Sequence, residues 1–146
     1  MRLPEHSVPP CSLRLVLVDT RAERRHLMRQ MVEGGQDGTS VVAEADSRDA
    51  ALLLVAEQRA DAVVVDIHMP VAEGLKTIRD LRRSYPQLGI VVCSFGLGPA
   101  IEREAIVDGA HACLAKPASR HKLRGALEKA CSHQQSSVDR VPVASA

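Results

Sequence analysis

Short apolar segments alternate five times with segments of helical periodicity, and this alternation limits the possible folds more than any other feature of the chain. The apolar segments are rich in β-branched residues and have the length of strands, while the others repeat apolar residues every three or four positions. The predicted strands are residues 13–18, 41–45, 62–66, 90–93 and 112–114, and the predicted helices are residues 22–33, 48–59, 75–85, 99–107 and 123–130. Strands that are joined through helices lie parallel, with right-handed crossovers. We therefore expect an α/β fold: a doubly wound, five-stranded parallel sheet in the order 2-1-3-4-5.

Composition limits the partners of such a domain. The 146 residues suffice for one domain, and the formal net charge is +1, with acidic and basic residues mixed along the chain. This balance predicts neither a nucleic-acid groove nor attachment to an anionic membrane surface. The aromatic residues are Tyr85 and Phe95 alone, which is too few for a platform on which bases stack. We expect no direct nucleic-acid binding.

The ends of the chain differ from its middle. Residues 1–11 are rich in proline and polar residues, and residues 132–146 lack a clear period, so we expect a flexible leader and a flexible tail around a domain at 12–131. No apolar run is long enough for a membrane span, and no signal peptide is evident. The four cysteines lack C-x-x-C spacing, which favours unligated thiols in a reducing compartment. These features predict a cytoplasmic protein without a membrane partner.

One carboxylate stands at an unusual place in this pattern. Val63, Val64 and Val65 lead directly into Asp66, and Ile67-His68-Met69-Pro70 follow. A strand buried on both faces has no use for an unpaired charge within the core. At the carboxyl end of the strand, the same side chain would project into the crevice where open α/β sheets bind ligands.

The other predicted strands also end on polar residues. Asp19 and Thr20 follow the first strand, Ser94 follows the fourth, and Lys116 follows the fifth. Any one of these residues is most simply explained as part of a solvated loop. Because the carboxyl ends of parallel strands lie at one edge of the sheet, we expect all of them to lie near Asp66.

These residues resemble the receiver domain of bacterial two-component response regulators, in its stand-alone, single-domain type. The resemblance covers about residues 13–131 and implies a flavodoxin-like receiver fold. It is carried by the runs Leu17-Val18-Asp19, Asp66-Ile67-His68-Met69-Pro70 with Gly74, Val92-Cys93-Ser94, Gly109-Ala110 and Lys116-Pro117. It implies that Asp66 accepts a phosphoryl group from a sensor histidine kinase or a phosphotransfer protein in a phosphorelay.

The resemblance also implies the roles of the neighbouring residues. Mg²⁺ would be held by Asp19, Asp66 and the main-chain carbonyl of His68, with Thr20 as a further candidate ligand. Lys116 would pair with a phosphoryl oxygen and Ser94 would hydrogen-bond another, which draws Ser94 inward after transfer. The Lys116–Pro117 peptide bond would be cis, so that the lysine points towards Asp66.

The output implied by the resemblance is a change in protein contacts rather than turnover of a substrate, so we do not expect an enzyme. A downstream protein would bind the face formed by the fourth helix, fifth strand and fifth helix, and this face also offers a possible homodimer contact. In the family, the fifth strand often carries an aromatic residue there. The corresponding residue in this chain is Cys113, which we expect simply to pack.

Two departures from the family pattern keep an alternative open. Thr20 stands where most receivers have a second acid, which predicts weaker metal binding. Phe95 stands where a small residue is common, so its ring either shields the acceptor or packs in a groove beneath the fourth helix. The alternative is a degenerate receiver that acts as a phosphorylation-independent interaction module. An unrelated α/β enzyme is disfavoured, because neither a G-x-S-x-G elbow nor a P-loop is present.

Overall fold

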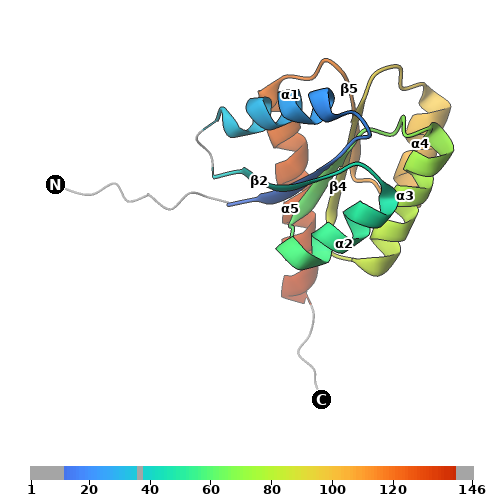
Figure 1. Ribbon diagram of the computed structural model, residues 1–146. Helices are drawn as coiled ribbons and strands as arrows, with labels where there is room; N and C mark the ends of the chain where they lie inside the picture. The colour runs from blue at the N-terminus through green and yellow to red at the C-terminus, as the bar shows by residue number, and fades with distance from the viewer. Residues whose placement is uncertain (1–11, 36–37, 141–146) are drawn as a thin grey trace.

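The computed structural model describes residues 12–35 and 38–140, so the predicted leader at 1–11 and the last residues of the predicted tail lie outside the described residues. The described chain alternates strands and helices throughout (Figure 1). The elements are β1 (Arg14–Val18), α1 (Ala22–Glu33), β2 (Ser40–Ala45), α2 (Arg48–Gln58), β3 (Ala62–Val65), α3 (Val71–Ser84), β4 (Gly89–Ser94), α4 (Pro99–Asp108), β5 (Ala112–Ala115) and α5 (Arg120–Arg140).

The five strands form one sheet, in the order β2-β1-β3-β4-β5. All four neighbouring pairs are parallel, so the carboxyl ends of the strands lie at one edge. Both the fold class and the strand order predicted from the sequence are confirmed. The order reverses between β1 and β3, which is where open α/β sheets leave a crevice.

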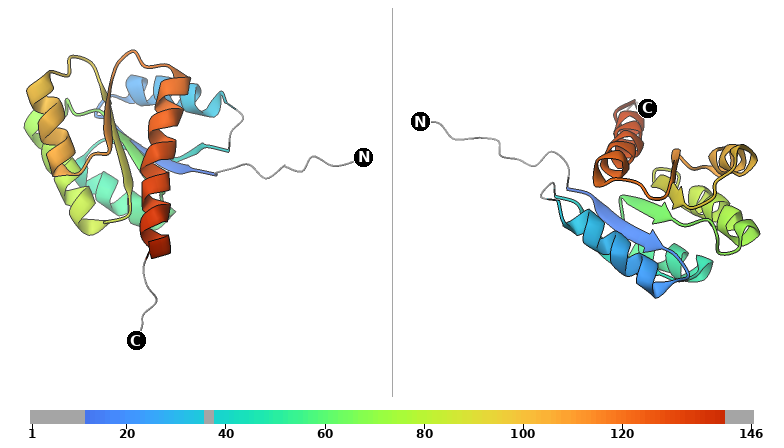
Figure 2. Two further views of the ribbon diagram at one scale, coloured as in Figure 1. Left: turned by 180° about the vertical axis from the view of Figure 1, so that it is seen from behind. Right: turned by 90° about the horizontal axis from the view of Figure 1, so that it is seen from above.

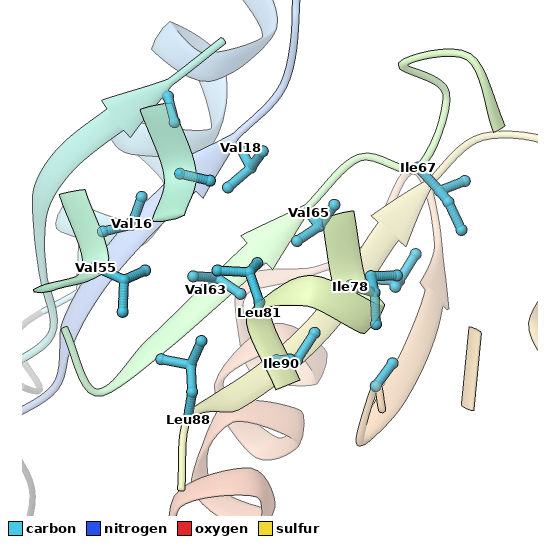
Figure 3. Packing of buried hydrophobic residues seen from close by; sticks show 14 of the residues in the cluster. Val16, Val18, Val55, Val63, Val65, Ile67, Ile78, Leu81, Leu88 and Ile90 are labelled. Atoms are coloured by element: carbon cyan, nitrogen blue, oxygen red, sulfur yellow. The ribbon is translucent and has the colours of Figure 1, made fainter. Parts of the chain in front are cut away.

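Both faces of the sheet are buried, and successive residues of a strand point to opposite faces. Val63 and Val65 of β3 pack with α2, α3 and α4, whereas Ala62 and Val64 pack with α1 and α5. Figure 1 shows α3 and α4 to the right of the strands and α2 in the foreground, and the left view of Figure 2 brings α5 to the front. Figure 3 shows the first of these two layers, in which valines of the strands meet Leu81 of α3. This packing explains why the strands consist almost entirely of apolar residues.

Two helices differ from their predicted bounds. Helix α3 begins at Val71, so Gly74 lies within its first turn rather than before it. A Cβ atom at position 74 would collide with the main-chain carbonyl of Ile67, so glycine allows α3 to start close beside the end of β3. Helix α5 continues to Arg140, and residues 132–140, predicted as the start of a flexible tail, are helical. Across the described part of the chain, no helix combines the length and apolar character that crossing a membrane requires.

Candidate functional site

Three charged residues predicted for the site meet at the carboxyl edge of the sheet. Asp19, Asp66 and Lys116 directly follow β1, β3 and β5. Lys116 Nζ lies 3.0 Å from Asp66 Oδ2 and 3.8 Å from Asp19 Oδ2. Both carboxylates are buried, with Asp66 only 4% exposed. The alternation of side chains along the strands places all three on the face that α1 and α5 cover.

The other oxygen of Asp66 is held by neutral donors. The main-chain N–H of His68 donates to Asp66 Oδ1 at 2.9 Å, and Ser94 Oγ donates to the same oxygen at 3.1 Å. Ser94 is the last residue of β4 and is fully buried, and its hydroxyl accepts a hydrogen bond from the N–H of Ile67 at 2.8 Å. The serine hydroxyl therefore links the end of β4 to the Asp66 carboxylate.

The ionisation of Asp66 reflects these contacts. Burial raises the pKa of its carboxyl group, but hydrogen bonds from His68, Lys116 and Ser94, together with the positive charge of Lys116, outweigh burial and hold the pKa below its usual value. Asp66 is therefore a buried carboxylate that stays ionised, as a nucleophile requires.

Two cis peptide bonds lie in the loops around the site. The Lys116–Pro117 peptide bond is cis, as predicted, and the lysine amine points towards Asp66. The Met69–Pro70 bond is also cis, which the sequence did not predict. Both prolines lie in loops at the same edge of the sheet.

Arg24 is a site residue that the sequence analysis missed. Its Nη1 lies 3.3 Å from Asp66 Oδ2, on the same oxygen that Lys116 contacts. The helical period gives a signal for this position: Arg24, Met28 and Met31 are spaced by four and three residues, and both methionines pack against the sheet. Arg24 thus lies on the same face of α1 as the two methionines, one turn nearer the start of the helix and beside the site.

The ring of Phe95 lies at the mouth of the site. Its centroid is 5.5 Å from the guanidinium carbon of Arg24 and 5.6 Å from the amine of Lys116. The ring borders a cavity of about 200 Å³ with Arg24, Leu27 and Pro117, and it is 48% exposed. The hypothesis that Phe95 packs in a groove beneath α4 is therefore wrong, and the ring instead covers the two cations.

The donor atoms at this edge fit a hard divalent cation. Asp19 and Asp66 supply carboxylates, and the hydrogen bond from His68 N–H places the backbone of that residue beside them. Mg²⁺ commonly binds through one or two carboxylates and keeps several waters. Thr20 is exposed at the same edge. The site differs from one built of side chains alone: among residues 12–35 and 38–140, no group of three or more histidine, cysteine, aspartate or glutamate side chains could hold a metal ion.

The arrangement of a buried acid, a second acid, a hydroxyl and a lysine at successive strand ends agrees with the comparisons to known proteins. The family model described as the response regulator receiver domain matches residues 15–128. This chain belongs to that family.

Individual relatives and structures agree with this assignment. The protein-glutamate methylesterase/protein-glutamine glutaminase 3 of Hahella chejuensis is 34% identical over 105 residues, which cover 70% of this chain and 30% of that protein. The corresponding enzyme 1 of Paramagnetospirillum magneticum is 32% identical over 119 residues, covering 80% of this chain and 31% of that protein. The chain thus spans about a third of the length of these relatives. A crystal structure of a LuxR-family two-component response regulator from Aurantimonas sp. SI85-9A1 is 28% identical, with a TM-score of 0.77 over 84% of this chain and 87% of that chain.

Membership of the receiver family confirms the function predicted from the sequence, that of a response regulator receiver in two-component signalling. Receiver domains in general bind Mg²⁺ at their acidic site and interact with histidine kinases or phosphotransfer proteins. A receiver domain is in general not a turnover enzyme, and the methylesterase names belong to relatives that this chain matches over about a third of their length.

Cys113 occupies the position in β5 that is often aromatic in receivers. It is partly buried and packs against the cluster of α2, α3 and α4, as expected. Burial and the negative charge of Glu102 raise the pKa of its thiol to about 11. The thiol is therefore protonated at neutral pH.

Proposed function

We propose that Asp66 of this receiver accepts a phosphoryl group from the phosphohistidine of a sensor kinase or phosphotransfer protein. The observation that carries the proposal is the state of Asp66: the carboxylate is buried at a strand end, yet Lys116, His68 and Ser94 keep it ionised. A structural ion pair has no need of donors from three separate segments at the topological switch point of a sheet.

The transfer exchanges one P–N bond for one O–P bond and takes one proton from solvent. A carboxylate oxygen of Asp66 attacks phosphorus, a new O–P bond forms, and the P–N bond of the phosphohistidine breaks. The electron pair of that bond stays on the imidazole nitrogen, which takes up a proton and leaves as neutral histidine. Asp66 becomes an acyl phosphate, and the carboxylate loses its own charge as the anionic phosphoryl group joins it.

The residues around Asp66 stabilise the charge that arrives. The amine of Lys116, 3.0 Å from Asp66 Oδ2, pairs with a phosphoryl oxygen, and the hydroxyl of Ser94 donates to another. When bound by Asp19, Asp66 and the main-chain carbonyl of His68, Mg²⁺ supplies positive charge that offsets repulsion between the carboxylate and the phosphoryl group. Thr20 replaces an acid that most receivers place there, so metal binding at this site is weak.

The contacts of Asp66 also weigh against the alternative, a degenerate receiver that works only as an interaction module. Asp66, Ser94 and Lys116 are all present, and each pair that the chemistry requires lies within hydrogen-bond distance. A module that had abandoned phosphorylation would have no reason to keep a buried charge, which is costly unless it is paired.

The output of the receiver follows from the position of Ser94. This residue ends β4 and leads into the loop before α4, so a shift of its hydroxyl onto a phosphoryl group moves that loop. Ile106 and Val107 of α4 are 45% and 78% exposed on the adjoining surface. We propose that a downstream protein binds the face of α4, β5 and α5, and that a second copy of the receiver is an alternative occupant of the same face.

A labelling experiment tests the acceptor. The protein is incubated with acetyl phosphate over a range of Mg²⁺ concentrations and resolved on a phosphate-retarding gel, beside Asp66→Ala. We expect a retarded band in the wild type and none in the variant. The absence of an Asp66-dependent band at every Mg²⁺ concentration would refute the proposal.

A further inference from the structure

Arg24 brings a second cation to the acceptor carboxylate. Its guanidinium lies 3.3 Å from Asp66 Oδ2, and its side chain is 29% exposed, whereas that of Asp66 is 4% exposed. Lys116 reaches the same oxygen at 3.0 Å from the loop after β5. The two cations thus approach one carboxylate oxygen from different elements, α1 and the β5–α5 loop.

The ring of Phe95 lies close to both cations. Arg24 and Lys116 lie at nearly equal distances from its centroid, 5.5 Å and 5.6 Å. A cation within about 6 Å of an aromatic centroid is attracted by the negative face of the ring. The guanidinium of Arg24 therefore has two partners, the carboxylate of Asp66 and the ring at the mouth of the site.

The charges of the site are already balanced when Arg24 is counted. Asp19 and Asp66 carry two negative charges, and Lys116 and Arg24 carry two positive charges within the same group of contacts. Arg25 also donates to the main-chain carbonyl of Asp19, but its charge is paired with that of Glu44. Thr20 adds no negative charge where it stands. A divalent cation that enters this group would meet a carboxylate that is already neutralised, and a guanidinium that repels it.

We propose that Arg24 is a resident cation of the acceptor site, which competes with Mg²⁺ for the Asp66 carboxylate. In the metal-free receiver the guanidinium supplies part of the positive charge that a metal would supply. Binding of Mg²⁺ requires Arg24 to swing away, and its position in the first turn of α1 with a partly exposed side chain leaves solvent on one side. The significance of this competition rests on the proposed acceptor function.

A metal titration tests the competition directly. Mg²⁺ alone is titrated into the 146-residue chain by calorimetry, for the wild type, Arg24→Met, Arg24→Lys and the control Arg21→Met. Arg21 is exposed and lies at the start of the same helix, so the control removes one positive charge nearby. We expect Arg24→Met to bind Mg²⁺ about tenfold more tightly or better, Arg24→Lys to lie between it and the wild type, and Arg21→Met to stay within about twofold.

The outcomes separate this proposal from the acceptor function. The titration contains no phosphodonor, so its result does not depend on whether Asp66 can be labelled. An affinity of Arg24→Met within about twofold of the wild type, or no measurable Mg²⁺ binding by that variant, would overturn the proposal. A gain of the same size in Arg21→Met would also overturn it, because the effect would then be one of general charge. Circular dichroism checks that each variant is folded, and Arg24→Lys provides a conservative substitution at the same position.

Discussion

Arginines of helix α1 pair with two carboxylates outside that helix, Glu44 and Asp66, and these two are held in different ways. Two arginines of α1 donate to Glu44 of β2: Arg25 Nε lies 2.9 Å from Oε1, and Arg29 Nε lies 2.8 Å from Oε2. The side chain of Glu44 is 27% exposed. Asp66 is 4% exposed, and Arg24 is its longest charged contact, at 3.3 Å. The remaining donors to Asp66 come from other parts of the sheet edge.

The difference separates an ion pair that braces the fold from the carboxylate that we propose as the phosphoryl acceptor. Hydrogen bonds from Arg29 lead the lowering of the pKa of Glu44, against a smaller effect of burial. For Asp66, burial is the largest influence on the pKa and acts to raise it, and only the sum of several donors reverses it. A brace needs two neighbours on one helix, whereas a reactive buried carboxylate needs several strand ends to converge.

The largest expected effect is on the rate of Asp66 labelling, when the closest cation of each carboxylate is removed in turn. Lys116→Met removes the amine nearest to the acceptor, and we expect the rate of Asp66 labelling by acetyl phosphate to fall by about 10²–10³. The matched variant Arg29→Met removes the closest cation of Glu44, and labelling should stay within about twofold. Quantitative phosphate-retarding gels measure both rates, and equal losses in the two variants would contradict the distinction.

Burial without compensating donors should favour the uncharged form of a side chain, which is the opposite of what is seen at Asp66. Cys113 is such a case. Its thiol pKa is about 11, so the reactive thiolate is scarce at pH 8. We expect alkylation by iodoacetamide at pH 8 to be at least about tenfold slower than for a free thiol of pKa about 8.5. Peptide mass spectrometry over a series of pH values measures the rate; a midpoint near the free-thiol pKa would be inconsistent with the burial of Cys113.

The pH dependence of the free energy of unfolding should reflect the donors that lower the pKa of Asp66. Because the folded-state pKa is lowered, ionised Asp66 contributes stability that is complete above about pH 4 and is lost as the pH falls through the folded pKa. The stability of the wild type relative to Asp66→Asn should therefore decrease on acidification within that window. Urea unfolding at several pH values measures the difference. A difference that grows below about pH 4 would mean that burial, not the donors, dominates.

The smallest effect is expected at the other carboxylate. Glu44→Gln weakens a partly exposed network, so the free energy of unfolding should fall by about 0.2–1 kcal/mol, with Asp66 labelling unchanged. Chemical denaturation and the labelling gel measure the two quantities. A large loss of labelling in this variant would show that the brace and the acceptor are coupled.

The sequence was sufficient for the parts of the molecule that rest on strand pattern. The apolar runs ending in Asp19, Asp66, Ser94 and Lys116 predicted both the sheet and the meeting of these residues. The carboxyl ends of parallel strands all lie at one edge of the sheet, so polar residues at these ends come together whatever the conformation of the loops.

The parts that the sequence did not reveal depend on side chains from helices and loops. Arg24 reaches Asp66 only because the buried face of α1 is in phase with it, and it stands among several arginines of the same helix. The orientation of Phe95 depends on the path of the β4–α4 loop, where Gly96 adopts a positive φ. The length of α5 was missed because residues 132–140 carry little apolar periodicity.

The proposed function requires that Asp66 itself becomes an acyl phosphate. After incubation with acetyl phosphate and Mg²⁺, reduction with borohydride converts an aspartyl phosphate into homoserine, which peptide mass spectrometry locates in the chain. We expect homoserine at position 66, and its absence from a sample without phosphodonor. Homoserine at another aspartate, or at none over the whole range of Mg²⁺ concentrations, would contradict it.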